Sequence, residues 1–216
     1  TREVAPMRRF SGLAYASLIA LIMASSAHAA VITNGSFESP DIPGGSSFAF
    51  FNPGETIGSG WVVDAASPSA ILVLREAAGV HPTVLDGDQY AVIGLAPDFA
   101  TIRQDVALDA ASYRLSFQLA AGETVSDAAL TVDILQSGSS VIGGPTGFNV
   151  PTGSGFTGQS LDFTASTADS YRLVVTATGG ATAIDAFQIT AIPEPGTAVL
   201  LSLFAVPILL RRRRQN

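Results

Sequence analysis

Short stretches in which apolar and polar residues alternate recur along the middle of the chain. In residues 112–119 every odd position is aromatic or aliphatic and every even position is polar. Such a period of two puts the apolar side chains on one buried face of a β-strand. Alternation or a richness in β-branched and aromatic residues predicts further strands at residues 70–74, 89–93, 101–106, 130–134, 160–165, 171–176 and 187–189.

The spacing of these strands predicts an all-β fold. Gly-rich turns separate the short strands, and no window of about twelve body residues carries a helical stripe. We therefore expect an antiparallel β-sandwich of the jelly-roll type. Residues 138–158 are predicted to form a turn-rich surface section around one strand. The tetrapeptide Ser-Tyr-Arg-Leu, which begins at Ser112 and again at Ser170, indicates equivalent strand starts.

The first 29 residues are typical of a secretory signal peptide. A basic start, a short apolar run and small residues at a cleavage site define such a signal. Signal peptidase would therefore remove residues 1–29, with Met7 as the expected initiator after residues 1–6. The alternative is a buried helix of the domain. The residues that carry the pattern are Arg8, Arg9, the run 13–24, Ala27 and Ala29.

A second apolar segment, residues 191–216, is predicted to be a membrane anchor. The uncharged run 196–210 would span about 22 Å as a helix, somewhat less than a hydrocarbon core of about 30 Å. The basic cluster that follows this transmembrane helix would stay in the cytoplasm. The body of the chain would then lie on the opposite side of the membrane. The segment opens with Pro193, Glu194 and Pro195 and closes with Arg211, Arg212, Arg213 and Arg214.

This tail resembles the PEP-CTERM sorting signal of Gram-negative bacteria. The resemblance implies that an exosortase recognises Pro193, Glu194 and Pro195, removes the tail, and releases or attaches the protein. It also implies export through the inner membrane, a transient membrane anchor, and a final place at the cell surface or in an exopolysaccharide or biofilm matrix. The alternative is an ordinary tail anchor that stays in the membrane.

Composition narrows the classes of partner and chemistry. Residues 30–190 hold four arginines and sixteen acids, and the chain has no lysine or cysteine. An acidic surface repels phosphate backbones, so we expect no nucleic-acid partner. It is compatible with calcium binding. Without cysteine, disulfides, thiol catalysis and zinc–thiolate sites are excluded.

The body also resembles the galactose-binding-like jelly rolls, which include several carbohydrate-binding modules. The resemblance implies an opening strand at residues 31–38. It further implies that Glu38 and Asp185 hold a structural calcium ion, although Ala186 stands where many relatives have a second acid. The alternatives are a strand-end acid at Glu38 and a turn former at Asp185. The matching segments, in order, are residues 31–38, 60–61, 85–91, 102–104, 113–117 and 184–187.

Aromatic residues are the candidate sugar platforms, because sugar rings stack on aromatic faces. Trp61 and Tyr90 are the ligand-binding candidates, although a lone tryptophan between apolar residues is more often part of a core. Phe48, Phe50 and Phe51 lie in a stretch bounded by Gly and Pro and form either an exposed edge or a cover over the sheet.

Nothing in the sequence indicates an active site. His81, the histidine that remains after signal removal, precedes a proline in an expected loop, and no Gly-x-Ser-x-Gly elbow accompanies it. The sequence therefore predicts a non-catalytic exported protein of the cell surface or matrix, associated with polysaccharide. The alternative is a carbohydrate-binding module with a defined glycan ligand.

Overall fold

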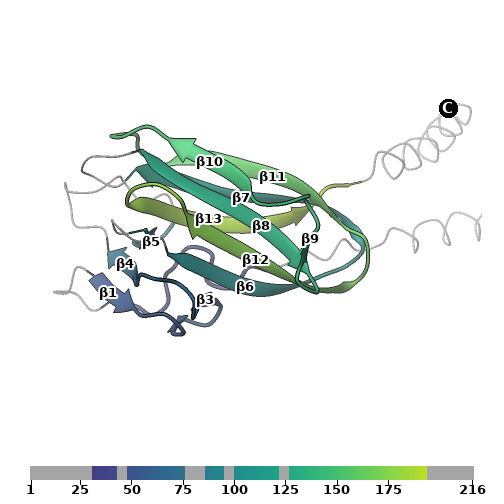
Figure 1. Ribbon diagram of the computed structural model, residues 1–216, viewed down its shortest axis with the longest axis horizontal. Coiled ribbons are helices and arrows are strands. Elements are labelled where there is room, and N and C mark those ends of the chain that lie inside the picture. Colours follow the sequence, from purple (N-terminus) through teal and green to yellow (C-terminus); the bar gives the residue numbers. More distant parts are fainter. Residues whose placement is uncertain (1–30, 43–47, 76–85, 95–99, 122–126, 194–216) are drawn as a thin grey trace, which may run out of the picture. The chain divides into compact units, whose positions relative to one another are not determined.

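The computed structural model describes residues 31–42, 48–75, 86–94, 100–121 and 127–193 (Figure 1). All of these except Pro193 belong to one compact unit, Ala29–Ile192. The predicted signal peptide and nearly all of the predicted sorting tail lie outside the described residues, so both stay predictions.

The described residues form thirteen strands and no helix. Every strand predicted from alternation or from β-branched and aromatic residues is confirmed, and residues 89–93 coincide with β5. The strands are β1 Phe48–Phe51, β2 Thr56–Ile57, β3 Trp61–Val63, β4 Ile71–Arg75, β5 Gln89–Ile93, β6 Thr101–Leu108, β7 Ala111–Ala121, β8 Ala128–Gln136, β9 Ser139–Ser140, β10 Thr146–Val150, β11 Thr157–Ala165, β12 Asp169–Ala177 and β13 Thr182–Ala191.

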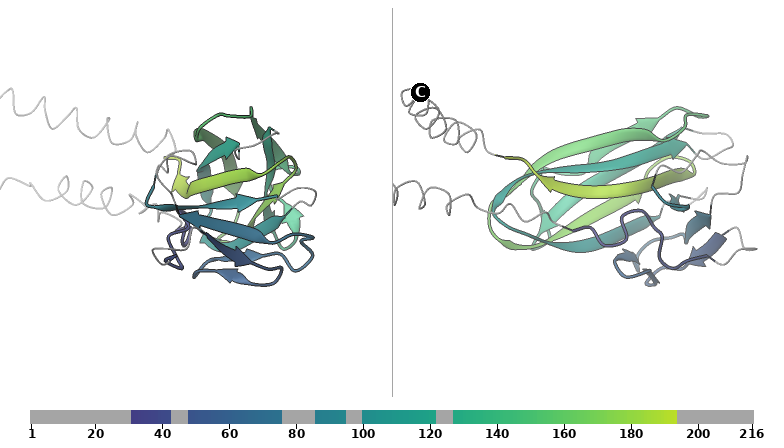
Figure 2. Two further views of the ribbon diagram at one scale, coloured as in Figure 1. Left: turned by 90° about the vertical axis from the view of Figure 1, so that its left-hand side faces the viewer. Right: turned by 180° about the vertical axis from the view of Figure 1, so that it is seen from behind.

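The strands build two antiparallel sheets that face each other (Figures 1 and 2). The six-stranded sheet has the order β1-β4-β5-β13-β7-β11, and the seven-stranded sheet has the order β10-β8-β12-β6-β3-β2, with β9 beside β8. The chain crosses repeatedly from one sheet to the other, so neighbours in a sheet are often distant in sequence. The predicted all-β antiparallel sandwich is therefore confirmed.

The core fills the space between the sheets. Phe117 of β7 and Phe187 of β13 stack with ring centroids 4.9 Å apart. Trp61, on β3 of the opposite sheet, meets Phe187 edge to face at 5.1 Å. All three rings are almost completely buried. Their burial ties the two sheets together, because each such ring removes a large apolar area from water.

The segment from residue 31 to residue 42 corrects one expectation. It forms a turn and extended chain rather than the opening strand. Two buried glutamine side chains bind its backbone in place of a neighbouring strand: Gln104 exchanges hydrogen bonds of 2.7 and 2.8 Å with Thr33, and Gln89 contacts Phe37 and Ile42 at 3.0 and 2.9 Å. These side chains satisfy backbone groups that a sheet would otherwise pair.

The turn-rich section at residues 138–158 also differs from its prediction. It contains two strands, β9 and β10, rather than one. β10 extends the seven-stranded sheet, because its register with β8 sets Phe148 opposite Leu130 on the core side. β10 is thus the one strand expected in this section, and the two-residue β9 is the addition.

Candidate functional site

A bulge in β13 holds the most deeply buried acid of the described residues. The register of β13 against β7 shifts between Asp185 and Gln188, and Ala186 takes a left-handed φ of 53°. Asp185 is fully buried, and its Oδ1 accepts a 2.7 Å hydrogen bond from the Ala186 amide. Its Oδ2 has no hydrogen-bond partner within the described residues. A buried carboxylate oxygen without a partner is costly, so this position is a candidate ligand site.

Glu38 lies close to this bulge and binds the loop before β5. Its Oε1 accepts hydrogen bonds from the amides of Asp88, at 2.8 Å, and Gln89, at 2.7 Å. Gly87 makes this approach possible, because a Cβ at that position would collide with the Glu38 carboxylate, and its φ of 84° favours glycine. The loop therefore wraps around the Glu38 carboxylate.

The electrostatics of this cluster are unfavourable for an ionised Asp185. Burial, the largest cause, raises the pKa of Asp185 from 3.8 to about 7, and the negative charges of Asp86 and Glu38 raise it further. The amides of Ala186 and Asp86 act in the opposite direction, because they donate hydrogen bonds to the carboxylate. Asp185 therefore holds its proton more tightly than an ordinary aspartate.

The residue types of this cluster fit a calcium ion, which takes carboxylate and carbonyl oxygens. The structure places the two acids that the sequence proposed, Glu38 and Asp185, near each other, although Glu38 is already engaged by two amides. In the described part of the chain, no three acidic or histidine side chains gather around one point. Backbone carbonyls and water would therefore have to complete the shell of any ion.

The outer face of the seven-stranded sheet carries a second candidate site, which sequence reasoning missed. Arg172 of β12 and Asp105 of β6 are opposite in register and pair through two hydrogen bonds, of 2.7 and 3.0 Å. The pair lowers the pKa of Asp105, chiefly through the hydrogen bonds from Arg172. Arg103 lies two residues before Asp105 on β6 and forms an ion pair of 3.4 Å with Asp64.

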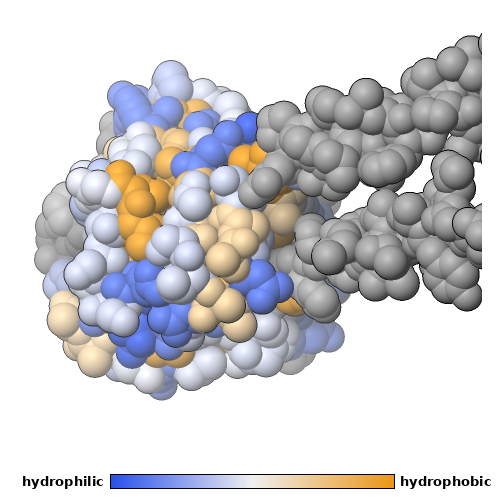
Figure 3. Space-filling model, turned by 90° about the vertical axis from the view of Figure 1, so that its right-hand side faces the viewer, coloured by the Kyte–Doolittle hydropathy of each residue, from blue (hydrophilic) through white to orange (hydrophobic). Residues whose placement is uncertain are grey.

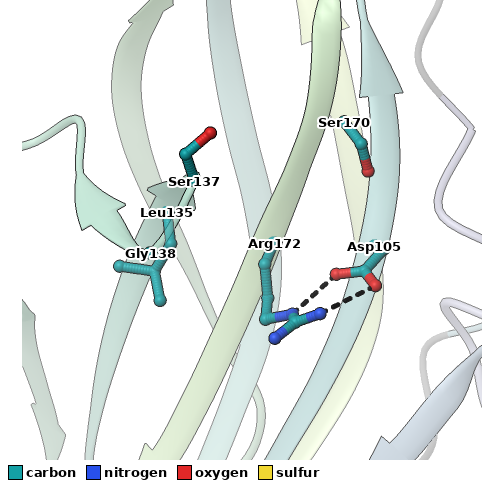
Figure 4. A pocket seen from close by; sticks show the side chains of 6 residues that line it. All are labelled: Asp105, Leu135, Ser137, Gly138, Ser170 and Arg172. Atoms are coloured by element: carbon teal, nitrogen blue, oxygen red, sulfur yellow. Dashed lines mark hydrogen bonds and ion pairs between the residues drawn. The ribbon is translucent and has the colours of Figure 1, made fainter.

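Two hollows adjoin the Arg172–Asp105 pair. One has a volume of about 170 Å³ and is drawn in Figure 4, where the pair lies across from the turn after β8. The other, of about 210 Å³, begins on the opposite side of Asp105. Besides the pair, the first is lined by Leu135, Ser137, Gly138 and Ser170, and the second by Thr33, Ser59, Gly60, Val62, Arg103 and Gln104.

The aromatic candidates lie in contrasting positions. Trp61 is fully buried, stacks on Phe37 at 5.6 Å, and donates a 3.1 Å hydrogen bond to the Asn34 carbonyl. Tyr90 is 1% exposed and meets Phe156 edge to face at 5.7 Å. These positions do not favour the ligand-binding role proposed for Trp61 and Tyr90, because neither ring offers a free face.

Two phenylalanines on β1 are exposed instead. Phe48 and Phe50, 48% and 56% exposed, lie on the outer face of the six-stranded sheet and touch edge to face at 5.2 Å. Phe51 points to the other side and packs against the core. Elsewhere, the face drawn in Figure 3 shows hydrophobic residues in separate areas among hydrophilic ones.

The remaining sequence candidates fall mostly outside the described residues. Pro193 is described and exposed, whereas Glu194, Pro195 and the arginines at positions 211–214 are not described, and neither is His81. Within the described part, no helix has the length and apolar character of a membrane span.

Comparison with known proteins finds solved structures of low similarity to this chain. No family model matches the sequence, and no curated protein resembles it. A family 61 carbohydrate-binding module, solved with β-1,4-galactotriose, is 17% identical over 74% of this chain and 97% of its own, with a TM-score of 0.47. The CBM22-1 xylan-binding domain of Paenibacillus barcinonensis Xyn10C is 16% identical over 68% of this chain and 94% of its own, with a TM-score of 0.43.

The enzymatically active domain of the bacteriophage CBA120 tailspike protein 4 is also similar, at 18% identity over 74% of this chain and a TM-score of 0.46, but the match spans only 21% of that domain. The two-sheet antiparallel sandwich of the described residues follows from the strand pairing itself. A likeness at this level concerns architecture, so function must be argued from the chain's own surface.

Proposed function

We propose that this chain is a non-catalytic glycan-binding sandwich, and that its site is the outer face of the seven-stranded sheet around Asp105. The observation that carries the proposal is the pair of hollows on either side of the Arg172–Asp105 ion pair. They place donors and acceptors in a row along an open sheet surface, which suits an extended ligand.

The chemistry of this surface matches that of sugar hydroxyls, which both donate and accept hydrogen bonds. Asp105 offers acceptor oxygens and Arg172 offers donors, while Ser170 and Ser59 can do either. Because each arginine of this face has a carboxylate partner, the surface is nearly balanced in charge. We therefore expect neutral glycans to bind better than strongly anionic ones.

The proposal includes the cellular setting that the two ends of the chain suggest. A signal peptide over residues 1–29 and a PEP-CTERM tail over residues 191–216 would deliver the sandwich to the cell surface or the extracellular matrix, where polysaccharide is abundant. Mass spectrometry of the released protein should find its C-terminus near Pro193–Pro195. An intact tail that still carries Arg211–Arg214 would contradict sorting by an exosortase.

A glycan array probed with the full chain tests the binding function. Arg172→Ala should weaken binding to any glycan that the wild type retains by about tenfold or more, because hydrogen bonds from a charged group contribute about 1.5–3 kcal/mol. Arg114→Ala is the matched control. Arg114 makes the same two-bond pair with Asp162, at 2.7 and 2.8 Å, but on the outer face of the other sheet.

Binding that survives in Arg114→Ala and fails in Arg172→Ala supports the proposed site. Equal losses of glycan binding in both variants would show that the binding site does not lie at Asp105. A wild type that binds no glycan on the array would contradict the proposed function.

A further inference from the structure

Two exposed aromatic side chains lie on a strand whose outer edge has no neighbour. β1 is the first strand of the six-stranded sheet, pairs with β4 alone, and lies at the margin of the sandwich (Figure 1). In the described part of the chain, the exposed large hydrophobic side chains are Phe48, Phe50 and Val31. An open backbone edge and two exposed aromatic rings therefore coincide on β1.

The backbone of β1 can accept a further strand. Apart from its ladder with β4, β1 makes no backbone hydrogen bond with another described residue. The amides and carbonyls of a strand point alternately to its two sides, so about half of those of β1 are open on the outer edge. Natural proteins commonly guard such an edge with charges or proline. β1 has the sequence Phe-Ala-Phe-Phe and contains neither.

The strand at the opposite end of the same sheet is guarded. β11 likewise pairs with a single strand, β7. Its exposed positions include Ser160, Asp162 and Thr164, and the carboxylate of Asp162 pairs with Arg114 at 2.7 Å. Both ends of the sheet are therefore open, but β1 is the end that combines an open edge with exposed apolar side chains.

A second copy of β1 fits this edge in a defined register. In an antiparallel pair, residues directly opposite each other point to the same face, with Cβ atoms about 4.5–5.5 Å apart. A twofold axis through Ala49 sets Phe48 of each copy opposite Phe50 of the other. The four rings then form one cluster on the outer face of the sheet, while Ala49, which packs against the core, meets its own counterpart.

Charge also favours β1 as the place where two copies meet. Residues 30–190 hold four arginines and sixteen acids, so two copies repel each other over most of their surfaces. β1 and residues 71–74 of the neighbouring β4 carry no charge. A contact through β1 keeps this neutral region at the centre of the interface. A twofold contact uses the same edge on both copies, so assembly through it stops at two.

We propose that β1 is a dimerisation edge. Two copies of the chain pair their β1 strands antiparallel about a twofold axis at Ala49, join their six-stranded sheets into one continuous sheet, and cover Phe48 and Phe50.

Sedimentation of the full chain by analytical ultracentrifugation, at concentrations up to about 0.1 mM, tests for the dimer. The wild type should form a concentration-dependent dimer. Phe48→Lys should raise its dissociation constant by about tenfold or more, because the substitution removes an aromatic anchor and buries an ammonium group without a partner. Ser160→Lys is the matched control at the other edge of the sheet and should change the constant by less than about twofold.

A monomeric wild type would overturn the proposal, and so would a dimer that Phe48→Lys leaves intact or that Ser160→Lys weakens equally. The terminal segments are identical in all variants, so the differences between variants report on the substituted strands.

Mixtures of variants test the register and show that the variants are folded. In a mixture of Phe48→Lys with Phe50→Glu, the introduced ammonium and carboxylate lie opposite each other across the axis, and the second pair of phenylalanines is intact. The dissociation constant of the mixed dimer should be about threefold or more below that of either variant alone.

A mixture of Phe48→Lys with Phe48→Glu is the control, because each introduced charge then faces Phe50 of the other copy. This mixture should show no such gain in affinity. An equal gain in both mixtures, or no gain in the first, would overturn the pairing about Ala49.

Discussion

The tetrapeptide Ser-Tyr-Arg-Leu occurs once in each sheet, and the two copies have the same local structure. It begins at the second residue of β7 and at the second residue of β12. In both copies the tyrosine is 1% exposed, and its hydroxyl donates to the carbonyl four residues upstream: Tyr113 to Asp109 at 3.1 Å, and Tyr171 to Thr167 at 2.9 Å. The copies thus confirm the expected equivalent strand starts.

The arginines of the two copies also behave alike, but their surroundings differ. Arg114 pairs with Asp162 on β11, the last strand of its sheet, whereas Arg172 pairs with Asp105 on β6, inside its sheet. The second pair adjoins the two hollows described above. A short motif thus specifies a strand start and an ion pair, while neighbouring strands and turns decide what surrounds that pair.

Truncation of the tyrosines should break the two copies equally. Tyr113→Ala and Tyr171→Ala should each lower the free energy of unfolding by about 3–5 kcal/mol, because each removes a buried aromatic side chain. The corresponding phenylalanine variants should lower it by about 1 kcal/mol, the contribution of one hydrogen bond. Denaturant titration followed by the fluorescence of Trp61, the single tryptophan, measures both. A tenfold difference in the equilibrium constant of unfolding between the Tyr113 variant and the corresponding Tyr171 variant would contradict the structural equivalence of the two copies.

The buried Asp185 sharpens the contrast with the paired aspartates. Its pKa of about 7 in the folded protein exceeds the unfolded value of 3.8. Protonated Asp185 therefore contributes roughly 2–4 kcal/mol to the free energy of unfolding. This contribution is complete below about pH 4 and is lost as the pH rises through 7. Urea unfolding in EGTA at several pH values should show this decline in the wild type.

Asp185→Asn is the control for that experiment, because an amide cannot ionise. The difference between wild type and variant isolates Asp185 from the other acids. An identical pH dependence in the two proteins would show that Asp185 ionises normally.

The ion pairs themselves should contribute least. Arg172→Ala should lower the free energy of unfolding by less than about 1 kcal/mol at pH 7, since the pair is about half exposed. The Arg172 guanidinium lowers the pKa of Asp105, so its contribution is present above about pH 4 and is lost as the pH falls. Arg114→Ala should behave in the same way, because Arg114 lowers the pKa of Asp162 through the same bonds. Denaturant unfolding at low and high salt measures the stability of both variants. A large loss of stability in only one variant would contradict the equivalence of the two ion pairs.

Much of the fold was predictable because its signals are local. Alternation of apolar and polar residues, or a richness in β-branched and aromatic residues, identified the strands from β4 to β8 and from β11 to β13. Residues 31–38 were assigned to a strand, although glutamine side chains hold them as a turn and extended chain. Those glutamines lie on strands that are distant in the sequence, so a local pattern of residues cannot predict their hydrogen bonds.

The candidate sites were less predictable for the same reason. Sequence resemblance proposed that Glu38 and Asp185 hold an ion together, which stays a prediction. It could not show that Glu38 is engaged by two loop amides or that Asp185 is fully buried. Trp61 looked like a platform or a core residue, and only packing against Phe37 and Phe187 decided for the core.

The sequence by itself determined the strand pattern and the acidic character of the body, and its two terminal segments predict export and sorting. The tertiary structure decided which charges meet. Arg172 and Asp105 are 67 residues apart in the chain and become partners only through the register of β12 against β6. The physical reason is that alternation is a property of each strand, whereas burial, pairing and pKa depend on strands that the chain brings together across the sandwich.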